Sequence, residues 1–152
     1  MKYIFLDIDG VLNCGDTKER CCEFVGIDPH KVAHLKYIVD ATGAQIVLTS
    51  TWKYEWHPIH KIMNDAMANY LDKALSDAGL VAIAKTDDDG FDRGAGIIEY
   101  LQQNPADAWV VLDDMIFPDF ERLGICEHLV LTNFDDDGLT QELARQAIEI
   151  LG

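Results

Sequence analysis

Hydrophobic and polar positions divide the chain into two kinds of segment that alternate. Short runs that are apolar throughout predict buried strands, and longer stretches with apolar residues three or four positions apart predict amphipathic helices. The expected strands are residues 2–8, 44–50, 80–85, 108–114 and 128–133, and the expected helices are residues 28–43, 58–79, 92–104 and 138–152. Strands that alternate with helices predict an α/β fold, a Rossmann-like doubly wound parallel sheet with helices on both faces.

Acidic residues stand at the start of two of the expected helices. Asp92 is the first residue of the third helix, just ahead of Arg93, and Asp135, Asp136 and Asp137 precede the last helix. Carboxylates at these places favour the positive end of a helix, so we expect them to act as N-terminal caps. The chain has no internal repeat, low-complexity tract or linker, and we expect a single domain over residues 1–152. The intervals between the strands leave no room for a large inserted second domain.

The charge of the chain limits its partners. The sequence has 27 acidic and 12 basic residues, a formal net charge of -15. A basic surface is what sequence-independent nucleic-acid binding requires, so we expect no extended nucleic-acid surface. A small phosphorylated substrate stays compatible with this charge, because a bound divalent cation reverses the local field.

The chain shows no signal for export or for a membrane. Only six residues precede Asp7, too few for a charged segment followed by an apolar one. No apolar stretch approaches the roughly 20 residues that cross a bilayer. The four cysteines lack the CxxC spacing, and reduced thiols are the expectation. We therefore expect a cytoplasmic protein with no membrane partner.

Three expected strands end in chemically capable side chains, in the stretches FLDID, IVLTST and VVLDD. In parallel α/β sheets, ligands bind beyond the carboxyl ends of the strands, so residues far apart in sequence meet there. The residues that this rule brings together are Asp7, Asp9, Thr49 or Ser50, Asp113 and Asp114. Several carboxylates in one crevice, with no histidine or cysteine cluster, suit Mg²⁺. A phosphate group beside them needs a fixed cation, for which Arg93 is the first candidate and Lys85 the competitor.

With these motifs in place, the chain resembles the haloacid dehalogenase (HAD) superfamily, whose members are mostly Mg²⁺-dependent phosphatases. The four motifs of that superfamily occur here in order as FLDIDGV, IVLTS, DRGAGIIEYL and VVLDD, and they span residues 4–114. DxD alone would be a weak signal in so acidic a chain, whereas four motifs in order at strand ends are specific. The stretches DIDGVLN and LTSTW are similar to the corresponding stretches of small HAD-like domains of bacteria and phages, some of them linked to RNA repair.

The resemblance implies roles for individual residues. Asp7 would attack phosphorus and carry an aspartyl-phosphate, and Asp9 would act as general acid and then general base. Mg²⁺ would be held by Asp7, the Asp9 main-chain carbonyl, Asp113 and Asp114. The phosphate would be bound by Gly10, by Ser50 or the neighbouring Thr49, and by Arg93. The implied activity is phosphomonoester hydrolysis on a phosphorylated substrate.

Other functions stay open at this point. A nucleotide or polynucleotide-end phosphatase is the nearest alternative, and the acidic charge weighs more against a long polynucleotide than against a single nucleotide. A non-catalytic phosphate-binding or signalling module would use similar groups in a different order. Trp52, Tyr54 and Trp56 either pack the start of the following helix, which we favour, or line the entrance and stack on a base or sugar.

Overall fold

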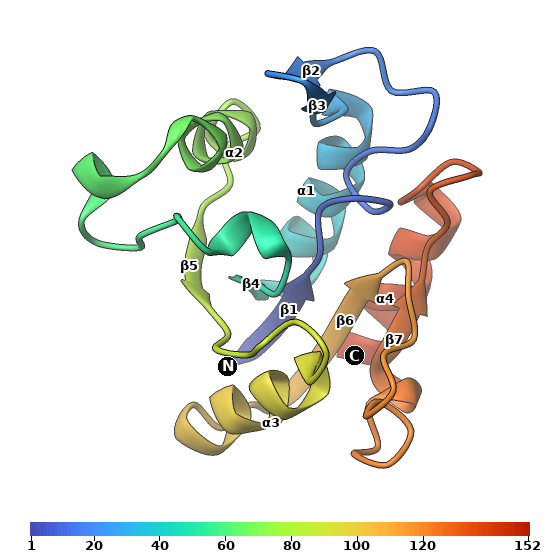
Figure 1. The fold of residues 1–152 in the computed structure, drawn as a ribbon. Helices are drawn as coiled ribbons and strands as arrows, with labels where there is room; N and C mark the ends of the chain where they lie inside the picture. The colour runs from blue at the N-terminus through green and yellow to red at the C-terminus, as the bar shows by residue number, and fades with distance from the viewer.

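The computed structural model describes residues 1–152 and has a five-stranded sheet at its centre (Figure 1). The strands in spatial order are β5 (Ala82–Lys85), β4 (Gln45–Leu48), β1 (Lys2–Leu6), β6 (Ala108–Asp113) and β7 (Leu129–Leu131). Every neighbouring pair in this sheet is parallel. The structure thus confirms the predicted Rossmann-like α/β fold, and β1, which carries the first motif at its end, lies at the middle of the sheet.

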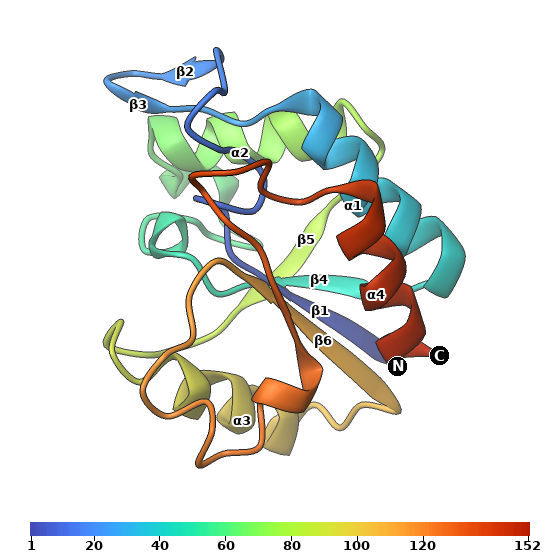
Figure 2. The same ribbon diagram turned by 90° about the vertical axis from the view of Figure 1, so that its right-hand side faces the viewer.

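Helices cover both faces of the sheet, as Figures 1 and 2 show. The four helices are α1 (Pro29–Thr42), α2 (Ala66–Ser76), α3 (Arg93–Gln103) and α4 (Gln141–Leu151). Residues of α1, α2 and α4 share one apolar core with the sheet, whereas α3 belongs to a second core on the opposite face. No helix has the length and apolar character that spanning a membrane requires.

Alternation along β1 explains why its sequence is apolar throughout. Ile4 and Leu6 enter the core on the side of α1 and α4, while Tyr3 and Phe5 enter the core on the side of α3. A strand buried on both faces has no polar positions until it ends. The same alternation directs the next residue, Asp7, toward the face that carries α3.

The prediction of one long helix over residues 58–79 is wrong in its first half. The chain there forms one short 3₁₀ helix, Lys61–Met63, and α2 begins only at Ala66; another 3₁₀ helix, Thr51–Lys53, lies earlier, just after β4. Asn64 has extended backbone, and its side chain accepts from the His57 amide and donates to Asp72. Asp65 then caps α2 by accepting from the Ala68 amide. Local side-chain bonds at Asn64 and Asp65 thus compete successfully with helix formation.

Two of the predicted helix caps are also wrong. Asp92 makes no capping hydrogen bond, and α3 is capped instead by Asp119, which accepts from the amides of Gly94 and Ala95 at 3.1 and 2.9 Å. Helix α4 is capped by Thr140, which accepts from the Leu143 amide. The acidic run at residues 135–137 lies in the turn before α4 and is exposed.

The segment between β1 and α1 forms a small flap and no cap domain. It contains an antiparallel pair of two-residue strands, β2 (Arg20–Cys21) and β3 (Phe24–Val25). Figure 1 places this pair beyond the carboxyl ends of the central strands. Asp9, beyond the end of β1, is exposed at that edge of the sheet.

Candidate functional site

Three carboxylates meet at the carboxyl ends of β1 and β6. Leu6 lies opposite Leu112 in the sheet, and the amide of Asp7 donates to the Leu112 carbonyl at 3.0 Å. Asp7 and Asp113 are the residues that follow Leu6 and Leu112, and they therefore lie side by side. Each of Asp7, Asp113 and Asp114 offers one carboxylate oxygen, and these three oxygens lie within 4.8 Å of one another.

Arg93, the first residue of α3, lies against this cluster. Its Nη1 atom is 3.2 Å from Asp7 Oδ1 and 2.8 Å from Asp113 Oδ2, and its guanidinium lies over the ring of Phe117. The buried Arg93 Nε has no hydrogen-bond partner. Lys85 instead donates to main-chain carbonyls of the segment after β4. Of the two candidate cations, Arg93 is the one that faces the acids.

The electrostatics of the cluster show an excess of negative charge. Burial and the neighbouring Asp113 raise the pKa of Asp7 well above its usual value, although Arg93 opposes this. Burial likewise raises the pKa of Asp113 to about 6, and burial raises that of Asp114. One arginine does not balance three carboxylates in so buried a place. A hard divalent cation with oxygen ligands, such as Mg²⁺, fits this donor set.

Gly10 lets the main chain pass close to the cluster. Its φ is +82°, and a Cβ atom built there would clash with the side chain of Asp114, so a larger residue would strain the main chain and displace Asp114. Its amide donates to Asn13 Oδ1 at 2.8 Å, and its carbonyl accepts from Thr132. The main chain beside Asp9 is thereby fixed against Asp114. A role of Gly10 in phosphate binding stays a prediction.

The Asp9 carboxylate lies apart from the other three acids. β1 ends at Leu6, so the strand alternation that would set Asp7 and Asp9 side by side does not reach Asp9. Asp9 is exposed, and its two oxygens accept from Asn13 Nδ2 at 2.9 Å and from Trp52 Nε1 at 3.1 Å. The carboxylate of Asp9 therefore stands outside the group formed by Asp7, Asp113 and Asp114, contrary to the expectation that all four acids meet, and Asp7 and Asp9 have distinct surroundings. Metal coordination by the Asp9 carbonyl stays a prediction.

Two hydroxyl groups follow β4 beside Asp7. The amide of Thr49 donates to the Leu6 carbonyl, which places Thr49 next to Asp7 in the sheet, and its buried Oγ1 has no partner. Ser50 Oγ accepts from the Trp52 amide at 3.2 Å, which leaves its own hydrogen available to donate. Both residues are buried, and both stay candidates for contact with a phosphate oxygen.

A buried ion pair between Lys53 and Asp88 stabilises the segment after β4, and the sequence pattern does not predict this pair. Lys53 Nζ lies 2.6 Å from Asp88 Oδ2 and 2.9 Å from Thr86 Oγ1, and burial lowers the pKa of Lys53. Lys85 supports the same segment from β5 through the carbonyls of Lys53 and Trp56. A single lysine between two aromatic residues gives no periodic signal, so only the packing of the folded chain reveals this support.

Of the three aromatic residues in this segment, only Trp56 is wholly a packing residue. It is fully buried in the core, and its indole donates to Asp72. Trp52 is buried but reaches Asp9, and Tyr54 is half exposed. The packing interpretation is therefore right for Trp56 and incomplete for the other two.

Comparison with known proteins identifies one family. The family model described as "HAD domain in Swiss Army Knife RNA repair proteins" matches residues 3–144. No curated protein and no solved structure matches the chain. The match spans all four motifs.

Proposed function

The chain belongs to the family of HAD domains found in Swiss Army Knife RNA repair proteins, and we propose that it is a Mg²⁺-dependent phosphomonoester hydrolase. The observation that carries the proposal is the position of Asp7. This buried carboxylate lies between two further acids and a single arginine, just after the carboxyl end of β1. The family and the residues present thus support the same chemistry.

The carboxylates of Asp7, Asp113 and Asp114 would hold Mg²⁺, with the main-chain carbonyl of Asp9 as a further ligand. When bound, the ion supplies positive charge that neutralises the transferring phosphoryl group. The three acids and the excess charge of the cluster support this assignment.

The residues of the chain divide the reaction into two steps. An Asp7 oxygen attacks phosphorus and forms an acyl-phosphate bond as the ester P–O bond breaks, and Asp9 gives a proton to the leaving oxygen. Arg93 and the hydroxyl of Ser50 or Thr49 stabilise the equatorial oxygens. Asp9 then takes a proton from water, which attacks the phosphorus of the intermediate. Asp7 is released as a carboxylate, and inorganic phosphate leaves.

Asp9 is placed to serve both steps. It is exposed at the edge of the cavity, whereas Asp7 is buried, so it can exchange a proton with a leaving group and with water. Its contacts with Asn13 and Trp52 fix its orientation without ion pairing.

Hydrolysis of an aryl phosphate tests the proposal. The wild type should release phosphate with Mg²⁺ and not with a chelator, and Asp7→Asn should abolish turnover. Asp135→Asn, a substitution of an exposed acid in the turn before α4, serves as the matched control and should retain full activity. Turnover that survives in Asp7→Asn or in chelator would contradict the proposal.

A further inference from the structure

A cavity of about 680 Å³ opens directly beside the acid cluster. Eleven residues line it, and two of them, Asp9 and Asp114, belong to the site already described. Its size lies within the range of small-molecule sites, roughly 300–1,000 Å³. A phosphate ester whose phosphorus lies at Asp7 would therefore extend its leaving group into this cavity.

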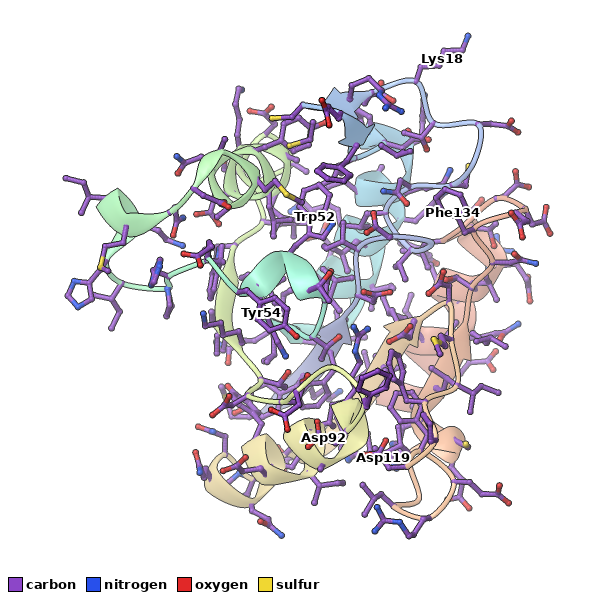
Figure 3. The ribbon with its side chains drawn as sticks, in the orientation of Figure 1. Lys18, Trp52, Tyr54, Asp92, Asp119 and Phe134 are labelled. Carbon is purple, nitrogen blue, oxygen red and sulfur yellow. The ribbon has the colours of Figure 1, made fainter.

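Aromatic rings from three distant parts of the chain surround the cavity. Phe24 comes from the flap, Trp52 and Tyr54 follow β4, and Phe134 follows β7. Phe24 and Tyr54 are 59% and 50% exposed and so can contact a ligand, whereas Trp52 is 5% exposed and is largely covered by the protein. Figure 3 shows Trp52, Tyr54 and Phe134 around the carboxyl ends of the central strands. Such rings bind flat ligands by stacking.

The negative charge of the cavity limits the charge that the leaving group of the substrate can carry. Four of the lining residues are acidic, namely Asp9, Glu55, Asp65 and Asp114, and none is lysine, arginine or histidine. Lys18 of the flap points away from the cavity in Figure 3. A second phosphate in the cavity would meet carboxylates and no cation, which is unfavourable.

We propose that this cavity binds the nucleoside part of a nucleoside monophosphate, with the base stacked among the aromatic rings and the single phosphate at Asp7. The inference rests on the proposed phosphatase function and names its substrate class. A flat, uncharged base suits the rings, and the absence of a further phosphate suits the carboxylates. Polynucleotide ends, which carry additional phosphates next to the terminal one, are disfavoured.

The first experiment measures the preference for a base. The preference is the ratio of kcat/KM for nucleoside monophosphates, both 3′ and 5′, to kcat/KM for glycerol phosphate. In Phe24→Ala and Tyr54→Ala this ratio should fall about fivefold or more, because base stacking is lost. Both side chains are exposed, so the variants should fold. Tyr37→Ala removes an exposed ring on α1 outside the cavity and should keep the ratio.

The second experiment measures the effect of an additional phosphate. The wild type should hydrolyse a nucleoside monophosphate at least about tenfold more efficiently than a dinucleotide with the same terminal phosphate. Glu55→Lys should narrow this difference by placing a cation beside the cavity.

The outcomes separate the two proposals. An unchanged base preference in both cavity variants, equal activity on the dinucleotide, or a higher kcat/KM for an aminoalkyl phosphate than for nucleotides would overturn the substrate class while the phosphatase function stands. Failure to hydrolyse any monoester with Mg²⁺ would overturn the phosphatase function, and the substrate class with it.

Discussion

At the scale of single residues, the site places charges where they are unfavourable without a ligand. Asp7 and Asp113 are buried next to each other, and Arg93 balances only part of their charge. Burying carboxylates with incomplete pairing costs stability, and such costs concentrate at functional sites. The energetic strain of these acids is therefore a measurable property of the metal-free protein.

The first prediction concerns the pH dependence of that stability. The pKa of Asp113 is about 6 in the folded chain against 3.8 ordinarily, so the folded chain retains a proton that the unfolded chain releases. Proton binding to the folded state favours folding below pH 4, and this contribution is lost as the pH rises to 6 and above. Urea unfolding in chelator from pH 4 to 8 measures it. Asp113→Asn should make the free energy of unfolding less dependent on pH in this window, and identical slopes would contradict the account.

The second prediction concerns the hydrogen bond from Trp52 to Asp9. Trp52→Phe keeps most of the buried ring but removes the N–H donor to Asp9 Oδ2. Because this donor orients the general acid, we expect kcat to fall about tenfold or more and its pH profile to change. Trp109→Phe, whose ring stacks on His128 away from the site, is the control. Unchanged kcat and an unchanged pH profile in Trp52→Phe would show that Trp52 only packs.

At the scale of elements, the sequence predicts those features that depend on residues close together in the chain. The apolar strands, the two-faced sheet and the meeting of Asp7 with Asp113 follow from periodicity and from the rule for parallel sheets. The partners of Asp9 and the cap of α3 do not follow, because Trp52 lies 43 residues from Asp9 and Asp119 lies 25 residues from Gly94. Contacts of this kind depend on how the elements pack, which local pattern does not encode.

The cap of α3 yields the third prediction. Asp119 accepts from two amides of the first turn of α3 and thereby positions Arg93 at the start of that helix. Asp119→Ala should lower the free energy of unfolding by about 1–2 kcal/mol and should also lower kcat. Asp92→Ala, at the position that makes no capping bond, should change stability by less than about 0.5 kcal/mol. Urea unfolding of both variants checks the assignment, and a larger loss in Asp92→Ala would reverse it.

At the scale of the whole molecule, the candidate catalytic residues lie at one edge of the sheet, and the rest of the fold holds that edge rigid. Cores on both faces fix β1 and β6, and the flap and the segment after β4 border the cavity. The net charge of -15 is distributed over a molecule with few cations near the site. A bound cation should therefore stabilise the whole fold.

The fourth prediction measures this stabilisation without substrate. Mg²⁺ at about a hundred times its Kd should add about 2.7 kcal/mol to the free energy of unfolding and raise Tm. Asp114→Asn removes one carboxylate of the cluster and should weaken the effect, whereas Asp136→Asn in the exposed turn should not. A Tm that does not respond to Mg²⁺ in the wild type would exclude a specific ion at this cluster.

The most direct test of the central claim is to trap phosphate on Asp7. In Asp9→Asn both steps lose Asp9, but an activated aryl leaving group departs as a phenolate without a proton, so formation of the intermediate is slowed less. Hydrolysis of the intermediate loses its general base and should slow about 10²- to 10⁴-fold, so the acyl-phosphate should accumulate. Acid quenching of Asp9→Asn during reaction with a labelled aryl phosphate, followed by peptide mass analysis, should find one phosphate on the peptide that contains Asp7. The double variant with Asp7→Asn should carry none. A wild type that turns over while no labelled Asp7 peptide forms in Asp9→Asn would contradict catalysis through Asp7.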